Sequence, residues 1–136
     1  MRDVAYIALG SNLGDRDAHL RFAREEIGQL PGTRILAASD IEETAPVGPI
    51  AQGPYLNQML AVETALDPRA LLAAVHHIEQ ARGRTRHERG GPRTLDIDIV
   101  LFEAQTVNES DLTVPHPELE ARDFWQRELS QIRVSP

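Results

Sequence analysis

Apolar residues recur along the chain with two spacings, and each spacing predicts one kind of element. The run DVAYIALG, residues 3–10, is apolar over most of its length and ends at a glycine, which predicts a short buried strand. Over residues 11–30 apolar side chains recur at helical spacing, and the GSNLG turn before them offers Ser11 or Asn12 as the helix cap. Residues 32–44, GTRILAASDIEET, predict a second strand.

From residue 45 onward the sequence predicts a loop, then a strand, a helix and a further strand. Three prolines and two glycines within residues 45–54 favour a shaped loop, and polar and apolar residues then alternate over 57–65 as in a strand. Asp67 as N-cap, Pro68 at the first helical position and Gly83 as the stop predict the next helix. TLDIDIVLF, residues 94–102, predicts a strand, and residues 106–129 predict a short extended piece, a proline-rich turn and a final helix.

The predicted order of elements is strand, helix, strand, strand, helix, strand, followed by a tail. This order fits an α+β fold with a ferredoxin-like βαββαβ core, in which helices pack on a mainly antiparallel sheet as three α-β-α layers. A chain of 136 residues is long enough for one core and short for two, so we expect a single domain over residues 1–136.

Two aspartates lie in the apolar strand at residues 94–102. Strict alternation predicts two faces: Ile97, Ile99 and Leu101 on one, and Asp96, Asp98, Val100 and Phe102 on the other. Neighbours on one face are about 6.7 Å apart between Cα atoms, from a rise of roughly 3.3–3.4 Å per residue. Two carboxylates this close repel each other unless a cation lies between them, and a small set of oxygen ligands suits Mg²⁺.

Arginines gather directly before this strand. The chain contains no lysine, and five of its fourteen basic residues fall in one short segment: Arg82, Arg84, Arg86, Arg89 and Arg93. Guanidinium groups bind phosphate oxygens with forked hydrogen bonds, and glycines at 83, 90 and 91 let the loop fit a ligand. Each feature alone also fits solvated surface charge, but carboxylates for a metal beside arginines for phosphates indicate a nucleoside triphosphate site.

Composition narrows the classes of function. A formal net charge of −7 disfavours general binding to nucleic acid, and no stretch approaches the roughly 20 apolar residues of a membrane helix, so neither partner is expected. The absence of cysteine fits a cytoplasmic protein, and we expect a monomer. Without lysine there is no Walker A motif, which excludes a P-loop as the phosphate site.

Seven segments, taken in order, resemble one enzyme family. They are AYIALGSNLGDR, ETAPVG, PYLNQ, IEQARGRTR, GPRTLDIDIVLF, LTVPHP and ARDF, and together they span nearly the whole chain. The chain is thereby similar to 6-hydroxymethyl-7,8-dihydropterin pyrophosphokinases, which move a pyrophosphoryl group from ATP to a pterin alcohol in folate biosynthesis. The resemblance implies attack of the pterin hydroxyl on the β-phosphorus of ATP and release of AMP.

The resemblance also implies a nucleotide and metal site. Asp96 and Asp98 would hold two Mg²⁺ ions that bridge the triphosphate, and Arg84 and Arg93 would act in catalysis by gripping the phosphates. Further positions match groups around ATP: Glu79, Arg86, Ile99, Thr113, His116 and Arg122. No residue is an obvious strong base, and the match assigns His116 to the nucleotide rather than to proton transfer.

The same resemblance implies a pterin site in the proline-rich loop region. Tyr55 and Phe124 would stack on the two faces of the pterin, which suits a flat heterocycle. The other expected substrate contacts come from the loop, the next strand and the metal site: Thr44, Pro46, Val47, Asn57 and Asp96. Trp125 is expected in the core, and the mid-helix residues His76 and His77 receive no role.

Three departures from the family pattern leave alternatives open. Gly90 stands where members commonly have tryptophan, Asp111 and Pro117 replace a basic and an aromatic residue near the nucleotide, and the tail WQRELSQIRVSP is polar and short. One alternative is a divergent paralogue that binds a different pterin or acts as a non-catalytic binding protein. A second is an RNA-binding module of the same fold, which requires exposed aromatic residues beside the basic segment.

Overall fold

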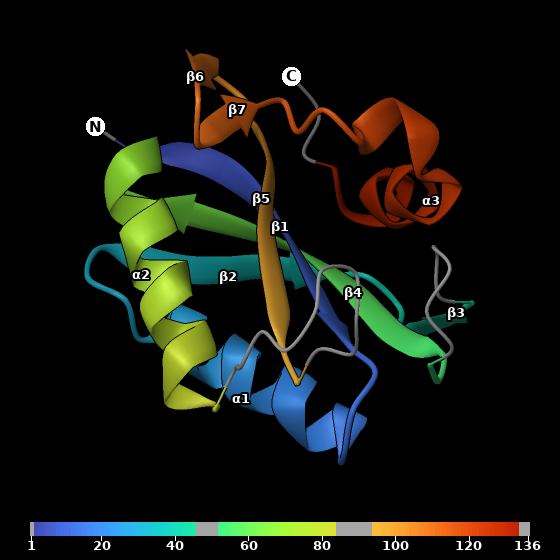
Figure 1. Ribbon diagram of the computed structural model, residues 1–136. Helices are drawn as coiled ribbons and strands as arrows, with labels where there is room; N and C mark the ends of the chain where they lie inside the picture. Colours follow the sequence, from blue (N-terminus) through green and yellow to red (C-terminus); the bar gives the residue numbers. More distant parts are fainter. Residues whose placement is uncertain (1, 46–51, 84–93, 134–136) are drawn as a thin grey trace.

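A computed structural model of the chain describes residues 2–45, 52–83 and 94–133, and all structural statements below concern these residues. Its elements alternate strands and helices in the predicted order (Figure 1). In chain order they are β1 (Asp3–Ser11), α1 (Arg16–Gly28), β2 (Thr33–Ala38), β3 (Glu42–Thr44), β4 (Tyr55–Thr64), α2 (Pro68–Ala81), β5 (Asp96–Phe102), β6 (Val107–Glu109), β7 (Leu112–Val114), the 3-10 turn η1 (Leu119–Ala121) and α3 (Asp123–Ile132).

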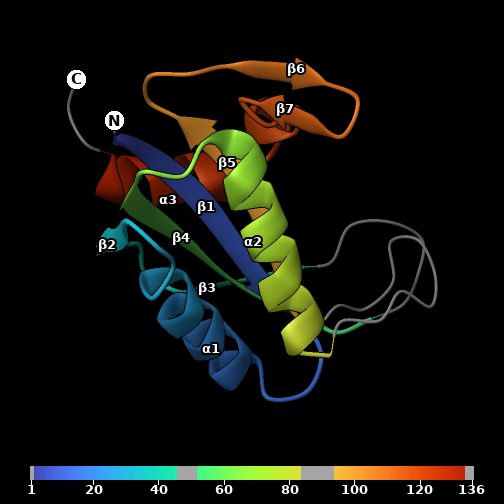
Figure 2. The same ribbon diagram turned by 90° about the vertical axis from the view of Figure 1, so that its left-hand side faces the viewer.

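The main sheet has the strand order β2-β4-β1-β5, with β3 also paired to β4, and every pairing is antiparallel. This is the order of a ferredoxin-like βαββαβ core. Helices α1 and α2 cover one face, and α3 lies against the other (Figure 1, Figure 2). The expected α+β fold with three layers is therefore confirmed, and β6 and β7 add a separate hairpin.

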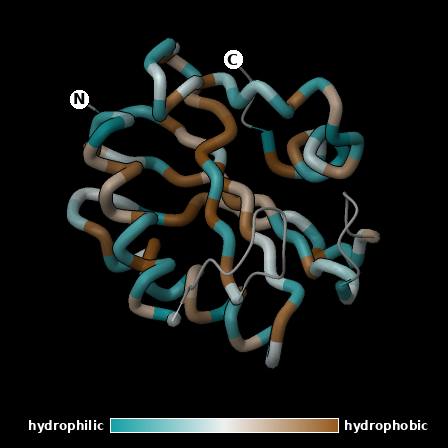
Figure 3. The backbone as a smooth tube through the Cα atoms, viewed as in Figure 1, coloured by the Kyte–Doolittle hydropathy of each residue, from teal (hydrophilic) through white to brown (hydrophobic). Residues whose placement is uncertain are grey.

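Apolar side chains fill both spaces between the layers. Between the sheet and the first two helices, Ile7 of β1 packs with Leu20 of α1 and Val75 of α2, all fully buried. On the other face Tyr6 packs with Trp125 of α3, which confirms the expected core position of Trp125. Figure 3 shows the hydrophobic residues concentrated along the strands that the helices enclose. No described helix has both the length and the apolar character needed to cross a bilayer.

Helix ends follow local signals, with one correction. The Asp67 carboxylate accepts a hydrogen bond from the backbone N–H of Ala70, Pro68 opens α2, and Gly83 takes the left-handed conformation with a φ of +79°. These features confirm the predicted second helix. The prediction that Ser11 or Asn12 caps the first helix is wrong, because α1 begins at Arg16 and its cap is Asp15.

The predicted strand over residues 32–44 is in fact two strands joined at Ser39. The Ser39 backbone N–H donates to the Met59 carbonyl at 2.9 Å, and the Ser39 hydroxyl accepts from the Met59 N–H at 2.9 Å. The serine side chain thus replaces one backbone partner of β4 between β2 and β3. A single continuous strand was the wrong prediction because this replacement depends on a partner 20 residues away.

A bulge in β5 corrects the predicted faces of that strand. Ile7 pairs with Ile99 and Tyr6 pairs with Leu101, so Val100 has no residue opposite it. Val100 and Leu101 therefore both pack on the α3 side, and Phe102 packs on the side of α1 and α2. The predicted places of Leu101 and Phe102 are wrong, whereas the residues before the bulge keep theirs.

The Ser39 linkage predicts a measurable loss of stability. Ser39→Ala removes the acceptor for the buried Met59 N–H, so the free energy of unfolding should fall by about 1–3 kcal/mol. Urea denaturation followed by circular dichroism measures this change. The matched control is Ser130→Ala on the exposed side of α3, which should change stability by less than about 0.5 kcal/mol. Equal effects of the two variants would contradict the role given to Ser39.

Candidate active site

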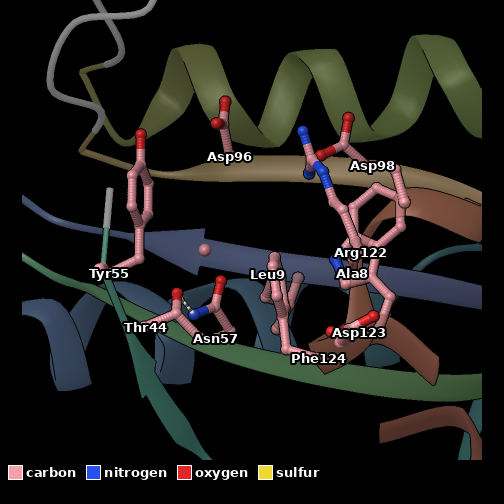
Figure 4. Close-up of a pocket in the computed structure, with 14 residues that line it drawn as sticks. Ala8, Leu9, Thr44, Tyr55, Asn57, Asp96, Asp98, Arg122, Asp123 and Phe124 are labelled. Atoms are coloured by element: carbon pink, nitrogen blue, oxygen red, sulfur yellow. Dashed lines mark hydrogen bonds between the residues drawn. The ribbon is translucent and has the colours of Figure 1, made fainter. Parts of the chain in front are cut away.

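A cavity of about 510 Å³ opens between α3 and the face of the sheet that α3 covers (Figure 4). Strand β1 forms its floor, β3 and β4 one side, and β5 and the start of α3 the other. Its lining residues are Ala8, Leu9, Gly10, Thr44, Ala45, Tyr55, Asn57, Asp96, Asp98, Ala121, Arg122, Asp123, Phe124 and Trp125.

Strand register creates the floor of this cavity. Gly10 of β1 pairs with Asp96 on one side and with Asn57 on the other, and Asn57 pairs in turn with Glu42. Directly paired residues in antiparallel strands point to the same face. A side chain at Gly10 would meet the Asn57 amide oxygen at 3.5 Å and the Tyr55 ring at 3.6 Å. The glycine therefore keeps the space between the aspartate and the amide open.

The predicted pterin residues meet in this cavity. Asn57 is buried, and its amide nitrogen donates to the Thr44 hydroxyl at 2.6 Å, as the dashed line in Figure 4 shows. Tyr55 reaches the cavity from β4 and Phe124 from α3, and both rings are partly exposed. With Asp96, the structure thus brings together five of the seven expected substrate residues, whereas Pro46 and Val47 lie outside the described residues.

Asp96 and Asp98 point to the same face of β5, as predicted from the alternation. Both carboxylates line the cavity and are partly exposed. They lie beside Gly10 and Ala8 of β1, whose small size leaves room above the sheet. The described residues contain no cluster of three or more potential metal-ligating side chains. Two carboxylates at an open site nevertheless suit Mg²⁺, which keeps several waters and takes further oxygens from phosphates.

A second cavity of about 290 Å³ adjoins the first at Asp98, which lines both. It lies between α2, β5 and the β6–β7 hairpin. The expected nucleotide residues Ile99, Thr113 and His116 line it, and Arg122 lines the first cavity. Residues expected for the two substrates therefore line adjoining cavities that share one aspartate.

The His116 ring is fixed on both sides. Its Nδ1 accepts the backbone N–H of Glu118 at 3.0 Å, and its ring packs edge-on against Trp125 with centroids 4.9 Å apart. Burial, and then the Arg122 guanidinium, lower the pKa of His116, so the ring is neutral at pH 7. The proton of the neutral ring then lies on Nε2, which is 3.8 Å from the Asp98 carboxylate. This geometry favours a hydrogen-bond donor over a base.

Arg122 lies at the start of α3 and lines the first cavity. Its guanidinium is 4.4 Å from the centre of the Trp125 ring and 3.9 Å from the Glu118 carboxylate. Stacking on an indole holds the planar guanidinium at a fixed angle while its edge stays available for hydrogen bonds. In Figure 4 the guanidinium lies on the side of the cavity that carries Asp98.

Glu79 holds β5 from the helical side. It is 3% exposed, and its carboxylate accepts the backbone N–H of Ile97 at 2.7 Å. Ile97 lies between the two aspartates, so this bond fixes the strand at the point where both carboxylates project. Among the described residues Glu79 is not part of either cavity lining, which supports a positioning role, and its contact with the nucleotide stays a prediction.

The Asp111 side chain is held by Arg69 of α2. Arg69 also binds Glu109, so one guanidinium fixes the β6–β7 hairpin that walls the second cavity. The hydrogen bond from Arg69 lowers the pKa of Asp111. The charge of Asp111, which stands where relatives carry a basic residue, is thus paired with a guanidinium. Pro117 also lines this cavity.

The arginine segment is described only at its start. The Arg82 Nε donates to His19 Nδ1 at 2.8 Å, and its guanidinium lies 4.8 Å from the centre of the Phe22 ring. Arg82 therefore ties α2 to α1 instead of facing the cavities. The predicted phosphate-binding residues Arg84, Arg86 and Arg93 lie outside the described residues.

Sequence reasoning missed several lining residues. His76, which received no role, lines the second cavity from α2, and Asp123 and Gly10 line the first. His76 is on the exposed side of an amphipathic helix, where side chains carry no periodic signal of their contacts. Gly10 looked only like the end of a strand, since its importance depends on the side chains paired across from it.

The bond between Glu79 and Ile97 predicts the effect of two substitutions. Glu79→Gln keeps an oxygen acceptor for the Ile97 N–H, whereas Glu79→Ala leaves this buried N–H without an acceptor. The alanine variant should lose about 1–3 kcal/mol of unfolding free energy, and the glutamine variant less than half of that. Thermal and urea denaturation measure both. Equal losses in the two variants would mean that packing, and not the hydrogen bond, holds the strand.

The chain is similar to known proteins along nearly all of its length. Residues 6–134 match the family model described as 7,8-dihydro-6-hydroxymethylpterin-pyrophosphokinase (HPPK). The 2-amino-4-hydroxy-6-hydroxymethyldihydropteridine pyrophosphokinase of Bacillus subtilis (strain 168) is 42% identical over 97% of this chain and 79% of that protein. The protein of the same name from Methylorubrum extorquens is 40% identical over 94% and 81%, respectively.

A solved structure supports the same fold. It is described as an HPPK-DHPS in complex with substrates, and it matches with a TM-score of 0.72 at 15% identity. The match covers 97% of this chain and 40% of the longer one. Given the family match over residues 6–134 and the identity of 42% to the protein from Bacillus subtilis, the chain belongs to the 7,8-dihydro-6-hydroxymethylpterin-pyrophosphokinase family, whose enzymes transfer pyrophosphate in folate biosynthesis.

Proposed function

We propose that this chain transfers a pyrophosphoryl group from ATP to 6-hydroxymethyl-7,8-dihydropterin and releases AMP, with Mg²⁺ as cofactor. The observation that carries the proposal is the meeting of two cavities at Asp98, with Asp96 beside it on the same face of β5. One cavity has the aromatic and amide groups that suit a pterin, and the other adjoins it where a triphosphate would need to pass.

The pterin occupies the larger cavity in this proposal. Tyr55 and Phe124 supply aromatic faces, and the buried Asn57 amide, held by Thr44, supplies polar atoms for the edge of the heterocycle. A ligand that lacks matching groups leaves a buried amide without partners, which disfavours its binding. Pro46 and Val47, which lie outside the described residues, complete the proposed set.

The nucleotide occupies the smaller cavity and extends to the aspartates. His116 donates through Nε2 on the side that faces Asp98, and Arg122 is held on Trp125 with its hydrogen-bonding edge available. Ile99 and Thr113 form part of the wall of the smaller cavity. Three arginines outside the described residues are proposed to bind the phosphates: Arg84, Arg86 and Arg93.

Asp96 and Asp98 hold two Mg²⁺ ions in this proposal, because both carboxylates are accessible, lie on one face and border the shared end of the two cavities. The bound cations supply charge neutralisation to the triphosphate. The protein positions the pterin hydroxyl for attack on the β-phosphorus. The new bond joins the hydroxyl oxygen to that phosphorus, the bond to the oxygen bridging the α- and β-phosphorus breaks, and AMP leaves while the hydroxyl proton is released.

Product analysis tests the reaction directly. The protein is supplied with ATP, Mg²⁺ and hydroxymethyl-dihydropterin, and nucleotides are separated by chromatography. We expect AMP to form in equal amount to the pterin diphosphate. Release of ADP would show transfer of a single phosphoryl group. Tight binding of the pterin without any AMP would instead support the non-catalytic paralogue and overturn the proposed enzyme.

Removing either metal ligand should stop turnover without unfolding the chain. Asp96→Asn and Asp98→Asn keep the side-chain size, and each should lower kcat by about 100-fold or more, as when one preorganised electrostatic contact is lost. Circular dichroism should show unchanged folding, because both groups are partly exposed. Asp17→Asn on the exposed side of α1 is the matched control and should keep full activity. Normal rates in both active-site variants would refute the assignment.

Filling the cavity floor should weaken pterin binding selectively. Gly10→Ala places a methyl group between Asn57 and the Tyr55 ring at distances the fold tolerates, 3.5 and 3.6 Å. We expect the KM for the pterin to rise about tenfold, which corresponds to about 1.4 kcal/mol, with the KM for ATP nearly unchanged. Steady-state kinetics with each substrate varied in turn measure both. An equal rise in both constants would argue against a pterin site at this floor.

A further inference from the structure

Two glutamates face each other beside the cavity proposed for the pterin, one fully buried and the other partly exposed. Glu128 lies on α3 with no exposed surface, and Glu42 lies on β3, next to Asn57 in the strand register. Both oxygens of Glu128 and the Oε1 of Glu42 are buried and lack a donor among the described residues. The other oxygen of Glu42 accepts from the Arg127 guanidinium at 3.2 Å.

Two ionised carboxylates are not tolerated in this arrangement. Each would be an acceptor only, so their buried oxygens would face each other without a hydrogen and with like charge. Burying an ionised carboxylate without a partner is so costly that the group instead takes up a proton. A proton on Glu128 turns it into a donor to Glu42, so that two of the three buried oxygens gain a hydrogen-bond partner and the like charges no longer meet.

The surrounding charges agree with this assignment. Burial, and next the hydrogen bond and charge of Glu42, raise the pKa of Glu128 to about 9, and only Arg127 acts in the opposite direction. The facing strands β1 and β4 present Tyr6, Ala8, Met59 and Ala61 to α3, of which Tyr6 alone can titrate. Glu120 of η1 and Asp40, whose N–H binds Gln131 of α3, are exposed.

The pair is placed to control the aromatic wall of the cavity. Phe124 and Glu128 are four residues apart on α3, so they lie on the same face of the helix, one turn apart. Phe124 lines the pterin cavity, and Glu42 continues the strand row that forms the cavity floor. The contact between the two glutamates thus joins the helix that carries one wall to the strand beside the floor.

We propose that Glu128 donates its proton to Glu42, and that this buried hydrogen bond positions α3, and with it Phe124, against the pterin cavity. Both glutamates are positioning residues and do not touch the substrate. The part of the inference that concerns the pterin rests on the proposed function. The protonation of Glu128 and the packing of α3 against the sheet do not depend on it.

Loss of this proton lowers the stability of the folded protein as the pH rises. The folded protein binds the proton more tightly than the unfolded chain, in which glutamate titrates near its ordinary pKa of 4.5. Its contribution to stability is therefore complete below about pH 4.5 and is lost as the pH rises to about 9. Above that pH the two carboxylates repel each other, and α3 is expected to separate from β3.

The single tryptophan of the chain reports on this event. Trp125 lies on α3 and is 2% exposed in the folded protein. Quenching of its fluorescence by acrylamide should increase with a midpoint near pH 9 in the wild type, while circular dichroism shows that the sheet stays folded. Glu128→Gln carries a neutral donor of similar shape, so its quenching should stay constant over the same range. Glu120→Gln, the same change at an exposed acid, should behave like the wild type.

Glu42→Gln provides a second test that does not depend on whether the Glu128→Gln variant folds. It removes the charge of the partner but leaves an oxygen acceptor for Glu128, so the midpoint should move to lower pH. An unchanged midpoint would show that Glu42 is not the partner. A wild type without any transition to pH 10.5, or a Glu128→Gln protein with the same transition, would overturn the proposal. Ionisation of Tyr6 would appear equally in both proteins.

Pterin binding supplies the functional readout. The Kd for hydroxymethyl-dihydropterin, measured by calorimetry with a non-hydrolysable ATP analogue present, should rise about tenfold from pH 8 to pH 10, because only the protonated fraction binds. The rise should be absent in Glu128→Gln. If neither protein binds pterin at pH 7, the proposed function fails while the Trp125 transition still decides the role of the proton. If pterin binds and AMP forms without that transition, the function stands and the proton inference fails.

Discussion

The antiparallel register of β1 with its two neighbours determines the candidate site. Gly10 lies opposite Asp96 on one side and Asn57 on the other, so a carboxylate, an open space and an amide follow each other across the sheet. A shift of one residue in either pairing would turn these side chains toward α1 and α2. Because backbone hydrogen bonds fix this register, Asp96, Gly10 and Asn57 are aligned by three strands and need no loop to place them.

The aspartates depend on support from the other face of the sheet. β5 is the last strand in the order β2-β4-β1-β5, so only β1 holds it within the sheet. On its outer side the buried Glu79 carboxylate binds the Ile97 N–H between the two aspartates. The bulge at Val100 follows directly, and it turns Leu101 toward α3 without moving the acidic end of the strand. The proposed metal-binding role and the packing role are thereby separated along the seven residues of β5.

Local signals allowed much of the fold to be predicted, and long-range ones account for the errors. Asp67, Pro68 and Gly83 define α2 within a few residues of the chain, so their pattern is legible in the sequence. The break at Ser39 and the bulge at Val100 each depend on a partner in another strand, Met59 or the Tyr6–Ile7 pair, which no local pattern shows. The aspartates were found from alternation, and the aromatic pair from the family resemblance. His76 and Gly10 were missed because their importance comes from the elements that face them.

The α3 side of the sheet carries two acidic pairs that avoid repulsion by different means. Asp96 and Asp98 remain accessible at the junction of the cavities, where hydrated divalent cations can reach them. The Oε1 of Glu42 and both oxygens of Glu128 are buried, and in our proposal a proton on Glu128 joins the two side chains. Asn57 lies in the row between Asp96 and Glu42. An uncharged amide there separates the two sets of charges, so the divalent cations proposed at Asp96 and Asp98 and the proton proposed on Glu128 would lie at opposite ends of one strand row, next to the cavity assigned to the pterin.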